Sequence, residues 1–346
     1  MVHHLFGWVQ HYDWGDPEFI PRYLNEPTDG RPWAEVWFGT HPSGPARIDA
    51  ENGALLESVS GPMTMLVKVL ACRAPLSLQT HPTITQAREG HAREEAAGIP
   101  RHDPRRMYRD ESDKPEMIVA LTRFEALCGF RDTASSIAAL RRMNWDSEAA
   151  TLASHGIAGY LRWSFEQQAP PSLRGVPSWL TRIASIHPDD PGLRVAPLLH
   201  HVVLQPGQAL ALPAGNLHAY MSGAGIEVMN SSDNVVRAGF TTKHVDVDEL
   251  LRIVDTSVLV DPVARPDVNG MWEHYPSPTD QFSVARFGWR KGDRIESAPT
   301  HRIVLGIHGH SGHHAGALFV PAGETLEMGP NGDSPDSGTV WVCTQN

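Results

Sequence analysis

The sequence has no excess of basic residues. Its 346 residues include 29 Lys and Arg against 40 Asp and Glu, which gives a formal net charge of -11. Proteins that bind nucleic acid neutralise phosphates with clustered Lys and Arg, so this balance argues against a nucleic-acid partner. A small anionic substrate needs only a few local cations and remains compatible with the charge.

Long apolar runs are also missing. No stretch reaches the roughly 18 consecutive apolar residues that a membrane-spanning helix needs. Residues 1–16 contain neither the basic region nor the apolar core of a secretion signal. We therefore expect a soluble, cytoplasmic protein without a membrane partner, and we favour a monomer.

Cysteine is scarce. The chain has three cysteines, Cys72, Cys128 and Cys343, and none of them forms a CxxC pair. This number and spacing suggest neither a disulfide framework nor a structural zinc cluster, so we expect reduced residues that serve mostly in packing. A Gly-rich phosphate loop is missing too, which argues against a fused nucleotidyltransferase.

Short apolar runs between Gly and Pro turns are abundant. They read as strands at 35–38, 65–71, 76–79, 117–121 and 125–130, and the same texture returns from Val202 onward. Many short strands of this kind favour an antiparallel jelly roll over a parallel α/β sheet. The sequence therefore predicts a mainly β protein, and its length allows two cores.

Two segments have helical texture. Residues 83–98 contain helix formers and end on Gly98, and residues 132–200 contain amphipathic stretches for which Asp132 and Asp146 are expected N-caps. We expect a helical insertion at 132–200 that divides a catalytic β domain into residues 1–131 and 201–250. Residues 251–346 would then form a second β domain.

Several polar residues occur where strand geometry brings side chains together. Gln79 and His81 are two residues apart in LSLQTHP, and Lys114 and Glu116 are two apart in SDKPEM, so each pair shares a strand face. His218 follows the turn PAGN. Gln79, His81, Glu116 and His218 would together offer nitrogen and oxygen ligands with one negative charge, which suits zinc with an open position. Spacing alone does not establish such a site.

Glu227 and Arg237 each lie within an apolar run, in IEVMN and NVVRAG. A charge in such a position must be paired or used in function. From the residues alone, a structural Glu227–Arg237 salt bridge and a functional role are equally acceptable.

Seven sequence blocks, in order, resemble type I mannose-6-phosphate isomerases of the cupin superfamily. The blocks cover roughly residues 10–250, and the last is long and unusual: YDWGD, AEVWFGTHPSGPA, LVKVL, PLSLQTHP, DKPEM, LPAGNLHAY and IEVMNSSDNVVRAGFTTK. The resemblance implies two cupin-type jelly-roll units with a helical insertion. It also implies an enzyme that interconverts mannose 6-phosphate and fructose 6-phosphate through a cis-enediol.

The resemblance also assigns roles to residues. It implies one zinc ion per chain, held by Gln79, His81, Glu116 and His218, and a catalytic arginine at Arg237. The further positions that match the family's pocket are Glu227, Lys114, Ser77, Asp233 and Lys243. Of these, Glu227 is the first candidate for the base and Lys114 the next, while Ser77, Asp233 and Lys243 are expected to contact the sugar phosphate.

Two positions depart from the family pattern. Thr83 and Ile84 follow His81-Pro82 where relatives often have Asp or Asn and then Lys, and Asp113 precedes Lys114 where relatives often have His. The first departure removes a peripheral cation. The second removes a possible proton carrier.

Two other cupin functions fit parts of the pattern. An Fe(II) oxygenase would use two His and one carboxylate around the metal, and Gln79 in place of a His argues against it. A non-catalytic sugar-binding cupin would not need Lys, Glu and Arg to converge on a metal. The run HGHSGHH at 308–314 could chelate a metal by itself, but we interpret it as a solvated loop.

Overall fold

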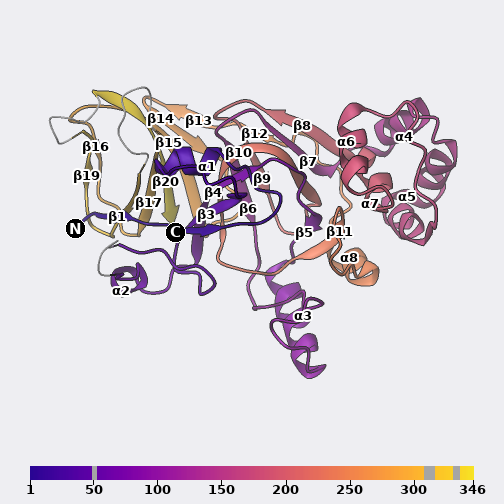
Figure 1. Cartoon of the computed structure of the whole chain (residues 1–346), viewed down its shortest axis with the longest axis horizontal. Coiled ribbons are helices and arrows are strands. Elements are labelled where there is room, and N and C mark those ends of the chain that lie inside the picture. The colour runs from indigo at the N-terminus through magenta and orange to yellow at the C-terminus, as the bar shows by residue number, and fades with distance from the viewer. Residues whose placement is uncertain (49–52, 308–315, 330–335) are drawn as a thin grey trace.

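The computed structural model describes residues 1–48, 53–307, 316–329 and 336–346. In these residues the strands form two large antiparallel sheets, of eleven and seven strands, and one two-stranded sheet. The seven-stranded sheet lies toward one end of the molecule and a group of helices lies at the other (Figure 1). The prediction of a mainly antiparallel β fold is confirmed.

The eleven-stranded sheet contains the strands that were predicted before residue 131. Its main path runs β12-β9-β6-β10-β4-β3-β2, and the long strand β10 also pairs with β5 and β7 around an irregularity between Tyr220 and Ser222. β11 pairs with β5, and β8 pairs with β7. The bounds are β2 Trp8–Gln10, β3 Glu35–Phe38, β4 Met65–Cys72, β5 Leu78–Thr80, β6 Glu116–Ala120, β7 Phe124–Phe130, β8 Leu199–Leu204, β9 Ala209–Leu212, β10 His218–Asn230, β11 Val236–Gly239 and β12 Val263–Ala264.

The seven-stranded sheet combines the two ends of the described chain. Its order is β1-β18-β17-β20-β15-β14-β13, so the first strand of the chain pairs with a strand close to its end. The bounds are β1 His3–Leu5, β13 Asp267–Asn269, β14 Trp272–Tyr275, β15 Phe282–Arg290, β17 Arg302–Ile307, β18 Ala317–Val320 and β20 Ser337–Gln345. The separate pair consists of β16 Arg294–Ile295 and β19 Leu326–Glu327.

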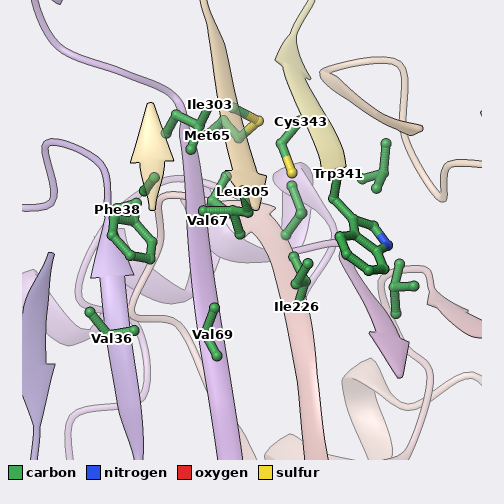
Figure 2. Close-up of a cluster of buried hydrophobic side chains, with 14 of the residues drawn as sticks. Val36, Phe38, Met65, Val67, Val69, Ile226, Ile303, Leu305, Trp341 and Cys343 are labelled. Atoms are coloured by element: carbon green, nitrogen blue, oxygen red, sulfur yellow. The ribbon is translucent and has the colours of Figure 1, made fainter. Parts of the chain in front are cut away.

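One hydrophobic core joins the two large sheets. Alternate residues of β3, β4 and β10 contribute Val36, Val67 and Ile226, and the seven-stranded sheet contributes Leu305 and Trp341 to the same cluster (Figure 2). All of these side chains are buried. Because strand side chains alternate between faces, the residues between them point away from this core.

The helical segment occupies the predicted region. Its elements are α4 Thr133–Arg142, α5 Asp146–Glu166, α6 Ser178–Ile186, α7 Gly192–Val195 and the 3₁₀ helix η1 Ala196–Leu198, followed directly by β8. Asp132 caps α4 by accepting a hydrogen bond from Ser135 N at 2.8 Å, as predicted. Asp146 is instead the first residue of α5, which has no side-chain cap. The proposed division into domains stays a prediction.

The remaining helices are α1 Phe19–Leu24, α2 Glu57–Ser60, α3 Ile84–Ala96 and α8 Val247–Ile253. The helix predicted at 83–98 is confirmed as α3. Across the described part of the chain, none of the helices has the length and apolarity that crossing a bilayer requires.

Candidate metal centre and catalytic pocket

Three of the four predicted metal ligands converge. His81 follows β5, Glu116 begins β6 and His218 begins β10, and all three are buried. Their ligand atoms lie within 4.8 Å of one another. His81 Nε2 is 3.4 Å from Glu116 Oε1, and His218 Nε2 is 3.2 Å from Glu116 Oε2. The sheet therefore forms a compact group of two imidazoles and one carboxylate.

The hydrogen bonds around this group suit a metal. His81 Nδ1 lies 2.7 Å from the carbonyl oxygen of Asn234, and His218 Nδ1 lies 3.1 Å from that of Asn216. A carbonyl only accepts, so each Nδ1 carries the proton and each Nε2 presents a lone pair. Both Nε2 atoms and Glu116 Oε2 are buried without a hydrogen-bond partner. Buried polar atoms are rarely left unsatisfied, so this arrangement fits a cation among them.

Gln79 lies next to this group. On one side it is in register with His218 of β10, and on the other side with Arg237 of β11. Ser77 Oγ donates a hydrogen bond to Gln79 Oε1 at 3.0 Å, which orients the amide. Its assignment as the fourth ligand stays a prediction.

Lys114 forms an ion pair with the central carboxylate. Its Nζ lies 2.9 Å from Glu116 Oε1, as expected for side chains that share a face across Pro115. Burial alone would raise the pKa of Glu116, but Lys114 and the two imidazoles hold it well below its ordinary value. Burial, and then the charge of Lys114, lower the pKa of His81 to about 4. The group therefore has the protonation states that metal binding requires: a carboxylate and a neutral imidazole.

Glu227 has a partner other than the one considered from sequence. Its Oε2 accepts a hydrogen bond from Lys68 Nζ at 2.9 Å, and Lys68 and Glu227 are direct register partners on β4 and β10. Lys68 also lies 3.6 Å from Glu35 Oε1. The alternative of a Glu227–Arg237 salt bridge is therefore wrong, because β10 places Glu227 beside β4 and not beside β11.

Lys68 and Glu35 were not identified from the sequence. A signal for them existed, because each is a single charge in an apolar strand, in MLVKVLA and EVWF. The nitrogen of Lys68 lies 5.2 Å from the centre of the Trp37 ring, and Trp37 Nε1 donates to Glu35 Oε2 at 2.6 Å. Burial alone would lower the pKa of Lys68, but the carboxylates of Glu227 and Glu35 raise it. Burial also raises the pKa of Glu227.

Arg237 and Lys243 lie on and just beyond β11. In the described ranges neither side chain makes an ion pair with a carboxylate or a hydrogen bond with a neighbour. Asp233 has other partners: its Oδ1 is 3.5 Å from His41 Nε2, and its backbone N–H donates to Asp110 Oδ2 at 2.9 Å. His41 was not identified from the sequence either.

The two departures from the family pattern have structural roles here. Thr83 is the N-cap of α3, and it forms a reciprocal capping box with Gln86. Asp113 Oδ1 accepts hydrogen bonds from Asn230 Nδ2 at 2.9 Å and from Gln281 Nε2 at 3.4 Å. Asp113 therefore connects the end of β10 to the C-terminal part of the chain. The histidine-rich run at 308–314 lies outside the described residues.

Comparisons with known proteins agree with this geometry. The family model for the phosphomannose isomerase type I catalytic domain matches residues 49–133. The mannose-6-phosphate isomerase of Salmonella typhimurium is 32% identical over 362 residues, covering 93% of this chain and 89% of that protein. The Escherichia coli enzyme of the same name is 33% identical over 374 residues, covering 96% and 95%.

A solved structure extends the likeness to the whole fold. It is the crystal structure of the Salmonella typhimurium mannose 6-phosphate isomerase bound to fructose 6-phosphate and zinc. The two folds match with a TM-score of 0.79 at 25% sequence identity, over 100% of this chain and 99% of that chain.

Proposed function

The chain belongs to the mannose-6-phosphate isomerase family, and from this premise we propose that it interconverts D-mannose 6-phosphate and D-fructose 6-phosphate with one bound zinc ion. The observation that carries the proposal is the buried group of His81, Glu116 and His218, whose two Nε2 atoms and one Oε2 atom have no partner. Gln79, in register with His218, would supply the fourth ligand.

Zinc at this position would supply a Lewis acid that polarises the carbonyl or hydroxyl oxygens of the substrate. The ligand set carries one formal negative charge, so the occupied site keeps a net positive charge. Gln79 as a fourth ligand would distinguish the site from the set of two His and one carboxylate alone, with several open positions, that an Fe(II) oxygenase uses. A purely sugar-binding cupin would not explain the buried ion pairs beside the metal group.

Glu227 is the proposed base. Isomerisation at C1 and C2 needs a group that removes a proton from carbon, and a carboxylate with a raised pKa is suited to this task. Burial raises the pKa of Glu227, while its hydrogen bond to Lys68 keeps an ionised form accessible. Lys114, whose Nζ contacts Glu116, is the second candidate for moving the proton.

Arg237 is the proposed stabiliser of the cis-enediol. Its register with Gln79 places it next to the metal group, and it has no carboxylate partner in the described residues. A positioned guanidinium stabilises negative charge as it develops on the substrate oxygens. Ser77, Asp233 and Lys243 are proposed to contact the sugar phosphate around this centre.

The test combines metal analysis with a coupled assay on mannose 6-phosphate, using protein purified without a His tag. We expect one zinc per chain, loss of activity on chelation and recovery when zinc is added back. Stoichiometric iron, or full activity in the metal-free protein, would contradict the proposal.

A further inference from the structure

Arg109 lies in the segment between α3 and β6 and differs from its neighbours Arg105 and Arg106. Arg105 pairs with Asp103 at 2.8 Å, and Arg106 Nε pairs with Glu94 at 3.0 Å. The side chain of Arg109 is half-buried, and within the described residues it makes no ion pair or hydrogen bond. A half-buried guanidinium that no carboxylate neutralises is available to bind a negatively charged ligand.

The backbone around Arg109 is held firmly. Its N–H donates to Asn234 Oδ1 at 2.7 Å, and the carboxylate of Glu94 accepts the N–H groups of Met107 and Tyr108, both at 2.9 Å. The carbonyl oxygen of Asn234 also accepts the hydrogen bond from His81 Nδ1. The position of Arg109 is therefore fixed relative to the metal group before any substrate binds.

The segment of Arg109 lies along the segment that leads to Arg237, because Val235 N–H donates to the carbonyl oxygen of Met107 at 3.2 Å and Arg109 N–H donates to Asn234 Oδ1 at 2.7 Å. With Arg237 and Lys243, Arg109 forms a group of three cations. Burial lowers the pKa of Arg237, and the charge of Arg109 lowers it further. Partial burial, and then the charges of Arg237 and Arg109, lower the pKa of Lys243. The three positive charges therefore repel one another, in a chain whose acidic residues outnumber its basic ones by 40 to 29.

The three cations differ in exposure. Arg237, in register with Gln79, and Arg109 are half-buried, and Lys243 is exposed. An extended sugar phosphate with its reacting carbons at the metal group would direct its phosphate toward these cations. A phosphate monoester carries between one and two negative charges at neutral pH, and the planar guanidinium fork matches two of its oxygens.

We propose that Arg109 is a substrate-binding residue that, with Lys243 and beside Arg237, binds the phosphate group of the sugar phosphate. The assignment rests on the proposed function for the identity of the sugar. It adds a residue from the α3–β6 segment to the pocket. Arg109 then determines the preference for phosphorylated over unphosphorylated sugar.

The test compares Arg109→Gln with Arg105→Gln, an exposed arginine of the same segment. For Arg109→Gln we expect KM for mannose 6-phosphate to rise about tenfold or more, with kcat within about twofold, because binding energy common to ground and transition states is lost. The inhibition constant of inorganic phosphate should rise by a similar factor. Arg105→Gln should leave both constants unchanged, and Arg109→Lys should recover part of the affinity.

Direct titration of the zinc-loaded chain with inorganic phosphate separates this proposal from the function itself. Weaker phosphate binding by Arg109→Gln supports the site even if mannose 6-phosphate is not converted. Unchanged phosphate binding in a folded, zinc-replete Arg109→Gln protein overturns it, even if the isomerase activity is confirmed. Failure of the wild-type chain to bind phosphate overturns it as well.

Discussion

The two faces of one sheet serve different purposes in this molecule. On β3, β4, β6 and β10, one face packs against the seven-stranded sheet and the other faces the metal group. The apolar face carries Val36, Val67, Val119 and Ile226. The polar face carries Glu35, Lys68, Glu116 and Glu227, all of them buried. Neighbouring residues of the same strands thus supply either packing or chemistry.

The contrast shows how the fold supports a charged interior. Burying apolar surface contributes about 25 cal/mol per Å², whereas a buried ion pair often contributes nothing net to stability because of desolvation. The apolar face can therefore hold the strands in register while the charged face is kept for its function. Changes on the two faces should have separable effects on stability and activity.

The largest effect is expected from removing a metal ligand on the polar face. His218→Ala takes away one of the two imidazoles, so zinc should fall well below one per chain and activity should drop to background. Metal analysis and the coupled assay measure both quantities. His155→Ala, which changes an exposed histidine of α5, is the matched control and should keep zinc and activity. Retention of stoichiometric zinc by His218→Ala would argue against the proposed ligand set.

The second largest effect concerns the ion pair between Lys68 and Glu227. Lys68→Met leaves two buried carboxylates without their cation, so the free energy of unfolding should fall by about 3–5 kcal/mol. The double variant Lys68→Met, Glu227→Leu has one fewer buried carboxylate, so it should recover part of the lost free energy of unfolding. It should remain inactive, because Glu227 is the proposed base. Chemical denaturation measures the free energy of unfolding. An unchanged value in Lys68→Met would show that the Lys68–Glu227 pair does not stabilise the fold.

A smaller free-energy change, confined to catalysis, is expected at Arg237. Arg237→Lys keeps the charge but loses the planar fork, so turnover should fall by about a hundredfold or more. Because Arg237 has no carboxylate partner in the described residues, Tm and bound zinc should stay nearly unchanged in both Arg237→Lys and Arg237→Ala. A lowered Tm together with normal turnover per folded molecule in these variants would show that Arg237 has a structural and not a catalytic role.

The smallest effect is expected on the apolar side. Ile303 of β17 is fully buried in the core shared by the two sheets. Ile303→Val should lower the free energy of unfolding by about 0.5–1.5 kcal/mol and leave turnover per folded molecule unchanged. A loss of turnover in the folded variant would mean that the two faces are coupled more tightly than their packing indicates.

Local pattern was sufficient for much of the fold. The runs EVWF and MLVKVLA form β3 and β4, as predicted. The shared strand faces expected for LSLQTHP and SDKPEM are consistent with the proximity of Gln79, His81, Lys114 and Glu116. Strand alternation is a local property, so it can be read without knowing the neighbours of a strand. The resemblance to a known family added the proposed role of Arg237, which alternation alone left open.

The pairings across strands could not be predicted in the same way. Glu227 meets Lys68, 159 residues away in the chain, because β10 lies beside β4. Which strands become neighbours depends on the whole topology, so Arg237, close in sequence, was the wrong partner to consider. Lys68 and Glu35 could still have been noticed by the rule that identified Glu227, since each is a single charge in an apolar run.

The pairing of β1 with β18 has a consequence for how the protein is made. His3 forms its register pair with Phe319, so β1 can pair only after β18 has been synthesised. Contacts so distant in sequence slow folding, and they leave the earlier strand unpaired until the later one has been synthesised. Because the eleven-stranded sheet shares its apolar core with the seven-stranded one, that face stays uncovered until β17 and β18 have been synthesised. A nascent chain that stops before residue 317 would present Val67 and Ile226 to solvent and would depend on chaperones to stay unaggregated.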